Sequence, residues 1–282
     1  MRSTKKIGAM LTIMAFVLSL MAITAFAATN DGVDWDKGII RATGYATGKN
    51  RALAHRAARM DAMRNLAEQV KGVQVDAEST MEDLELKNDL VKTKVSAIIK
   101  NMQEVGEPTY DKDGYCSIVM EMPLFGSSDS LAEAAFIPFK DQAKEPFPQP
   151  TTTTTTTTTT ITSNSAVAAA SAYNYTGLIV DCSGLGLKPV MSPVIKNNSG
   201  QPIYGYKNLD YDKIIAYGMA SYVRSVNDSA ASRAGNNPLV VKALSVENHN
   251  ANPIVKISDS DAILIANQGS HFLDNCAVVF VR

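Results

Sequence analysis

The sequence predicts a mixed α+β protein in which two globular domains are joined by a flexible linker. In residues 34–137, strand-like alternation gives way to helical periodicity, and residues 173–282 contain a second series of short apolar strands. Between them, residues 138–172 are rich in proline and include ten consecutive threonines, a composition with no apolar face to bury. The length of 282 residues favours about two domains, and 45% apolar with 20% charged residues is ordinary for a globular chain.

Residues 1–27 are predicted to be a secretory signal peptide. A cationic start at 2–6 precedes an uncharged apolar stretch at 7–26, which ends in the small-residue motif Ala-Phe-Ala at 25–27. We therefore expect cleavage after Ala27 and an exported chain, either periplasmic or associated with the cell envelope. The stretch is long enough to cross a membrane, so an uncleaved anchor is the alternative. No cysteine lies near the cleavage point, so we expect no lipid anchor. Cleavage would remove the apolar stretch, so we also expect no integral membrane span in the mature chain.

The first domain is expected to have the order β-α-β-α-β-β, with two helices covering one face of a mostly antiparallel sheet. A turn of hairpin chemistry, Asp-Lys-Asp-Gly at 111–114, joins the last two strands. The predicted elements are a strand at 39–47, a helix at 51–71, a short strand at 73–75, a helix at 84–100, and hairpin arms at 103–110 and 115–124.

Two arginines on the first predicted helix are candidate contact residues. Arg56 and Arg59 project into the apolar arc that we expect this helix to bury, where an unpaired charge would be costly. We expect them to form structural ion pairs, with a partner contact as the alternative. The Gly-containing stretch at 44–50 is one residue too short for a phosphate-binding loop and carries Asn50 where Ser or Thr would hold Mg²⁺. Its glycines are therefore expected to serve the turn and the packing.

The first domain resembles a known family of envelope proteins. The similarity rests on Trp-Asp-Lys-Gly at 35–38, Ala-Ala-Arg-Met-Asp-Ala at 57–62, Arg-Asn-Leu-Ala-Glu-Gln-Val at 64–70 and Val-Lys-Thr-Lys-Val at 91–95. Over about residues 34–126 the chain resembles the Lpp-twenty-type (twenty-kilodalton) envelope lipoproteins and is similar to the N-terminal domain of flagellar assembly protein T. The resemblance implies a non-enzymatic module near the outer membrane or the flagellum. This chain departs from the lipoproteins because it lacks their acylated cysteine.

The second domain, residues 173–282, is expected to be another α+β unit of unknown function. Seven of the ten tyrosines fall within its first fifty residues, and Tyr204 and Tyr206 share one face of a predicted strand. Such a face is a candidate platform for stacking on sugars, and ordinary packing is the alternative.

Cys182 and Cys276 are a candidate disulfide pair. Cys182 ends an early strand of the second domain and Cys276 begins the last one, so antiparallel neighbours would bring them together. Two buried free thiols are the alternative.

The sequence predicts a binding protein rather than an enzyme. A net charge of −1 gives no basic surplus for nucleic acid, and the three histidines and three cysteines show no ligand spacing for a metal. No catalytic, cofactor or metal site is expected, and Asp181 occupies the place where a nucleophile elbow needs glycine. We expect an exported protein that binds envelope proteins or cell-wall material. A wall-glycan (peptidoglycan) binding module and a secreted hydrolase are the alternatives.

Overall fold

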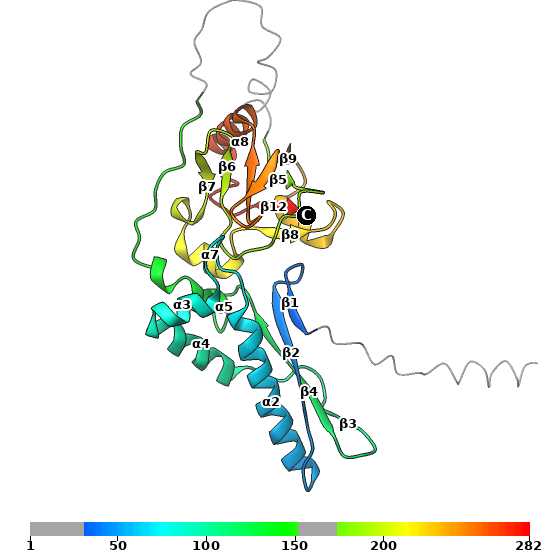
Figure 1. Ribbon diagram of the computed structural model, residues 1–282. Coiled ribbons are helices and arrows are strands. Elements are labelled where there is room, and N and C mark those ends of the chain that lie inside the picture. Colours follow the sequence, from blue (N-terminus) through cyan, green and yellow to red (C-terminus); the bar gives the residue numbers. More distant parts are fainter. Residues whose placement is uncertain (1–30, 152–173) are drawn as a thin grey trace, which may run out of the picture. The chain divides into compact units, whose positions relative to one another are not determined.

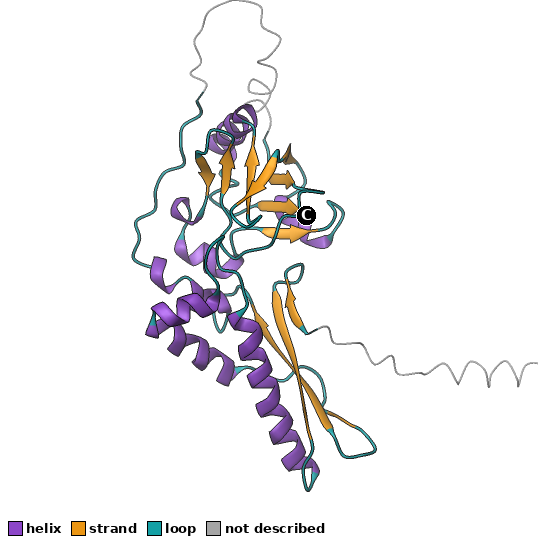
Figure 2. Ribbon diagram, viewed as in Figure 1, coloured by secondary structure: helices purple, strands orange, loops and turns teal. Residues whose placement is uncertain are grey.

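The computed structural model describes residues 31–151 and 174–282, and it places helices and sheets in both ranges (Figures 1 and 2). The predicted α+β class, with two α+β domains, is confirmed. The predicted signal peptide and the predicted linker from residue 152 to 172 lie outside the described residues. Within the described ranges, no helix has both the length and the apolar character needed to cross a bilayer.

The first domain is an antiparallel sheet of order β1-β2-β4-β3 with α2 packed along one face (Figure 1). The predicted first strand, first helix and hairpin are therefore confirmed. The elements are β1 (Gly32–Asp34), β2 (Ile39–Ala46), α2 (Arg51–Lys71), α3 (Met81–Lys87), α4 (Asp89–Asn101), β3 (Thr109–Tyr110), β4 (Cys116–Pro123), α5 (Leu131–Ala135) and the 3-10 helix η1 (Ile137–Phe139).

Small residues let α2 pack closely against β2. A Cβ atom on Gly44 would lie 2.2 Å from the Ala58 carbonyl oxygen and 2.3 Å from the Ala62 nitrogen. The helix backbone therefore occupies the space that a larger strand residue would fill. The helix begins where the Asn50 side chain accepts a hydrogen bond from the Leu53 N–H.

The predicted buried arc of this helix is only partly confirmed. Val70 is buried and Met63 and Ala67 pack against the core, but the N-terminal members of the arc are exposed: Ala52, Leu53, Ala57 and Met60. The buried residues recur at every fourth position, and they are Ala54, Ala58, Ala62, Leu66 and Val70. Leu53 and Met60, which belong to the predicted arc, are 45% and 66% exposed. Because glycine on β2 requires small residues opposite it, close backbone packing selects the alanine row over the larger apolar side chains.

The predicted second helix is two helices that meet at Asn88. This residue has an extended backbone, ends α3, and begins α4 by accepting hydrogen bonds from the N–H groups of Leu90 and Val91. Its side chain satisfies backbone donors that a continuous helix would satisfy internally. The chain can therefore turn between Leu84 and Lys100.

The second domain combines a parallel sheet of order β8-β12-β5-β9 with a mixed sheet of order β10-β11-β6-β7. The elements are β5 (Gly177–Asp181), β6 (Ile195–Asn197), β7 (Pro202–Tyr204), the 3-10 helix η2 (Tyr206–Asn208), α7 (Tyr211–Tyr217), β8 (Ser221–Val223), the 3-10 helix η3 (Ser229–Ala234), β9 (Pro238–Lys242), β10 (Ser245–Glu247), β11 (Asn252–Val255), α8 (Ile257–Ser270) and β12 (Val278–Val281). The helix α8 connects β11 of the mixed sheet to β12 of the parallel sheet.

The strand predicted at 73–75 is a contact segment instead. Gln74 forms only a single bridge, with Thr80. The carbonyl of Gln74 accepts a hydrogen bond from the Met191 N–H at 3.1 Å, and that of Val75 accepts one from the Ser192 N–H at 2.7 Å. These carbonyls therefore find their partners in the second domain rather than in the first sheet.

Candidate functional site

Residues 144–151, which we call the strap, follow η1 and are held against the second domain. Proline at 146, 148 and 150 removes backbone donors and favours an extended path without a strand ladder. The Glu145 N–H donates to the Lys207 carbonyl at 2.7 Å, and the Thr151 N–H donates to Asp261 Oδ1 at 2.8 Å. Lys144 pairs with Asp274 at 2.9 Å. The start of the predicted linker is therefore bound to a domain, which its composition did not reveal.

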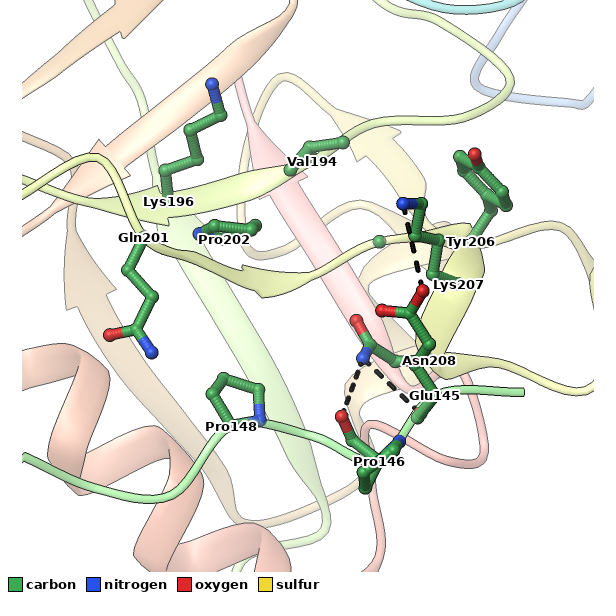
Figure 3. A pocket seen from close by; sticks show the side chains of 11 residues that line it. Glu145, Pro146, Pro148, Val194, Lys196, Gln201, Pro202, Tyr206, Lys207 and Asn208 are labelled. Carbon is green, nitrogen blue, oxygen red and sulfur yellow. Dashed lines mark hydrogen bonds and ion pairs between the residues drawn. The ribbon is translucent and has the colours of Figure 1, made fainter. Parts of the chain in front are cut away.

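A groove of about 410 Å³ lies between the strap and the β6–β7 hairpin (Figure 3). We call it the strap groove. In Figure 3, Pro148 on the strap and Gln201 on the hairpin face the gap between the two segments, whereas Lys196 points away from the strap. The groove is lined by Glu145, Pro146, Pro148, Val194, Lys196, Gln201, Pro202, Gly205, Tyr206, Lys207 and Asn208.

The charges around the strap groove are balanced. Lys196 forms an ion pair with Glu247 at 2.6 Å. Lys207 lies 3.7 Å from Glu145, and both side chains are more than half exposed, so this pair is weak. Three proline rings and a tyrosine supply apolar surface next to amide and ammonium groups. This lining suits a ligand with an apolar face and polar edges, such as a saccharide ring or an extended peptide.

A smaller cavity of about 190 Å³ also has Tyr206 in its lining. The Tyr206 ring is 4.6 Å from the ring of Phe139, which in turn contacts Phe136. Tyr211 also lines this cavity, and its burial, with nearby acidic groups, raises the pKa of its hydroxyl. Tyr206 is thus the aromatic side chain that the two cavities share.

A third hollow, of about 470 Å³, is lined by Arg233 together with Tyr217 and Ser221. The Arg233 guanidinium donates to the carbonyls of Cys276 at 2.6 Å, Tyr217 at 2.8 Å and Gly218. Burial lowers the pKa of Arg233. Because backbone carbonyls already accept from this guanidinium, we interpret it as a tie between loops and take the strap groove as the candidate site.

Of the two predicted tyrosine contacts, only Tyr206 reaches a cavity. Tyr204 is fully buried, and its hydroxyl donates to the Met219 carbonyl at 2.6 Å. Its assignment as a partner contact was wrong, because the two tyrosines leave the strand differently: Tyr204 ends β7 facing the core, whereas Tyr206 begins η2. The turn at Gly205 breaks the alternation on which the prediction relied.

The two arginines predicted as contact residues, Arg56 and Arg59, also differ in their surroundings. Arg59 donates to Glu104 at 2.8 Å and to the Met102 carbonyl at 3.0 Å, so its predicted structural ion pair is confirmed. His55 lies 2.7 Å from the same carboxylate. Desolvation acts to raise the pKa of Glu104, but the hydrogen bonds from Arg59 and His55 outweigh it and lower that pKa. Arg56 is exposed, and the predicted ion pair for it is absent among the described residues.

The predicted disulfide between Cys182 and Cys276 does not form. All three cysteines, each in a described range, are buried free thiols. Cys182 follows the end of β5 and Cys276 precedes the start of β12, but these strands are parallel neighbours. The two residues therefore lie at opposite ends of the sheet, about 20 Å apart at the rise of a strand. Burial raises the pKa of the Cys182 thiol to about 12.

Apart from Tyr206, the residues that shape the strap groove were not predicted from the sequence. Pro146 and Pro148 lie in the predicted linker, and Asn208, for which no role was predicted, donates to the Pro146 carbonyl at 3.1 Å. Phe147, an apolar residue between the prolines that packs against the core, was the available signal. Among the described residues, no group of three His, Cys, Asp or Glu side chains is placed to hold a metal ion.

The second domain is similar to a domain of a spirochaete protein. Residues 177–282 match the family model described as the second domain of Treponema pallidum Tp0624. The match covers less than half of the chain. No curated protein matches this sequence. The resemblance of residues 34–126 to the envelope lipoproteins stays a prediction.

Proposed function

We propose that this chain is an exported, non-enzymatic protein of the cell envelope, and that its second domain binds another envelope component through the strap groove. The observation that carries the proposal is the lining of this groove, which presents proline and tyrosine surface beside amides and paired charges. Apolar rings beside amide and charged groups are suited to holding a ligand in place. A hydrolytic site would need a base positioned next to a nucleophile.

Two features of the sequence support an envelope location. The order of residues 1–27 is typical of a cleaved signal peptide, and residues 34–126 resemble envelope proteins that lie near the outer membrane or the flagellum. The chain lacks the acylated cysteine of those lipoproteins, so we propose that it is held by protein or wall contacts rather than by lipid.

Site-specific photocrosslinking in intact cells tests the proposal. A photoreactive residue replaces Gln201, an exposed side chain of the strap groove, and in a control it replaces Lys112, an exposed side chain of the first domain. We expect an adduct from position 201 that is lost when Tyr206→Ala is added. No adduct, or the same adduct from both positions, would contradict a binding role for the groove.

A wall glycan is the second candidate ligand, favoured by the position of Tyr206 between the two cavities. An aromatic ring at a cavity mouth stacks on the apolar face of a sugar. Sedimentation with purified peptidoglycan distinguishes the candidates: a glycan ligand requires co-sedimentation that Tyr206→Ala reduces. A chain that stays in the supernatant while still giving the crosslink has a protein partner.

A further inference from the structure

The outer face of α2 is apolar and cationic. Leu53 and Met60 are 45% and 66% exposed on the side of the helix that faces away from the sheet, and Ala57 lies between them, also exposed. Residues 49–60 contain four cationic side chains and no carboxylate. Two of these have partners, because Arg51 lies over the Tyr110 ring and Arg59 pairs with Glu104. The cation of Arg56 remains exposed. We call this surface the α2 face.

The α3–α4 corner of the same domain is apolar and acidic. Leu86 is 80% exposed and Leu90 is 68% exposed, at the junction where Asn88 separates the two helices. Residues 81–92 contain four carboxylates against two lysines. The carboxylates of Glu82 and Asp89 are on exposed residues beside these leucines.

The α2 face and the α3–α4 corner therefore each expose apolar side chains, and they carry charges of opposite sign. They cannot meet within one copy. The corner neighbours the end of α2, because α3 contacts α2. There Glu68, with smaller effects of Glu82 and Glu85, raises the pKa of Lys71. Arg56 lies fifteen residues earlier on the same helix, which is about 22 Å along its axis.

We infer that the α2 face of one copy binds the α3–α4 corner of a second copy. In this contact Leu86 and Leu90 cover Leu53 and Met60, and the acidic rim of the corner meets the cations of the α2 face. The charge complementarity identifies the occupant, because each surface offers what the other lacks. The interface is heterologous: in a pair, one copy keeps its α3–α4 corner free and the other keeps its α2 face free, so the assembly grows head to tail.

The test uses two variants that each remove one surface. Met60→Ser with Arg56→Glu removes the α2 face, and Leu86→Ser with Glu82→Lys removes the corner. Every altered side chain is exposed, so we expect both variants to fold with an unchanged circular dichroism spectrum. Val240→Ser with Lys242→Glu is the matched control, since it changes an exposed apolar residue and an exposed lysine of the second domain.

Sedimentation velocity of the mature chain from about 10 µM to about 200 µM measures the association. We expect the average mass to rise with concentration for the unaltered chain and the control, and each single-surface variant to weaken association by about tenfold or more. A mixture of the two variants should form a heterodimer and stop there, because one supplies the corner and the other the α2 face.

A chain that stays monomeric throughout this range overturns the inference. So does a mixture in which the two variants fail to associate, or in which both retain the behaviour of the unaltered chain. Binding of a monomeric chain to vesicles containing anionic lipid, abolished by Arg56→Glu, would assign the α2 face to a membrane surface instead.

Discussion

Replacing Arg233 should destabilise the second domain, although no ion pair is lost. Its guanidinium ties η3 to two other segments, through the carbonyls of Tyr217 and Gly218 at the end of α7 and of Cys276 before β12. The carbonyls at the end of α7 lack intrahelical partners, and a cation there also interacts favourably with the helix dipole. Arg233→Met keeps the apolar stem and removes all of these donors.

The magnitude follows from the number of bonds and their surroundings. A hydrogen bond that involves a charged group contributes about 1.5–3 kcal/mol, so three give an upper bound of several kcal/mol. Two effects reduce the loss. The hollow beside Arg233 admits water to the freed carbonyls, and the variant escapes the desolvation that lowers the Arg233 pKa. We therefore expect Arg233→Met to cost about 2–4 kcal/mol and Arg233→Lys about half as much.

Urea denaturation measures this change, followed by circular dichroism and by the fluorescence of Trp35, the single tryptophan of the chain. Arg224→Met is the matched control. Its side chain is 76% exposed and lies 4.0 Å from Asp36, so it should cost less than about 0.5 kcal/mol. If Arg233→Met unfolds at the same urea concentration as Arg224→Met, the interpretation of Arg233 as a tie between loops is refuted.

Four further outcomes are expected. Gly44→Val should cost about 3 kcal/mol or more in urea denaturation because its side chain enters the backbone of α2, whereas Gly269→Ala, in a helix with open space around it, should change stability by less than about 1 kcal/mol. Glu104→Gln should be destabilising at neutral pH, and the difference should vanish in acid, because a carboxylate with a lowered pKa loses its contribution as pH falls from the ordinary value of 4.5 through the lowered one. Thiol titration of the unfolded, non-reduced chain should count three free cysteines, and a count of one would restore the disulfide. N-terminal sequencing of the cellular protein should begin near Ala28, and recovery of intact Met1 in membranes would show an uncleaved anchor.

Local chemistry predicted the elements of the first domain more reliably than their packing. The start of the first helix at residue 51 and the turn at 111–114 are determined by a few neighbouring residues, and both occur where the sequence predicts them. Which side of α2 faces the sheet depends instead on Gly44, a residue of another element. Hydrophobic periodicity gives no weight to a glycine, so the alanine row was overlooked.

The cysteine prediction failed for a reason of topology. The positions of β5 and β12 were predicted correctly, but strand direction within a sheet is a non-local property that depends on the crossovers between them. An antiparallel pair would have placed Cys182 beside Cys276, and the parallel pair separates them by the length of the strand. The continuous apolar runs at 178–180 and 278–281 were the available signal, because strands buried on both faces are typical of parallel sheets.

The strap groove was missed because composition describes a segment without its neighbours. Proline at alternate positions and a following threonine run are typical of a linker, and residues 144–151 indeed form no regular element. Their backbone groups are satisfied instead by the second domain, through Glu145, Thr151 and the carbonyl of Pro146. An extended segment of this kind needs no propensity of its own, because the surface beneath supplies its hydrogen bonds.

The exposed part of the predicted arc on α2 carries information about function. Only the N-terminal part of the predicted arc, with Leu53 and Met60, faces solvent, because the alanine row already fills the contact with β2. Leu53 and Met60 are thus not explained by the fold of a single copy. An acidic apolar corner on the same domain explains them, and it also explains why the exposed Arg56 stands beside them without a carboxylate partner among the described residues. The exposed apolar side chains of α2 therefore point to association between copies rather than to the core.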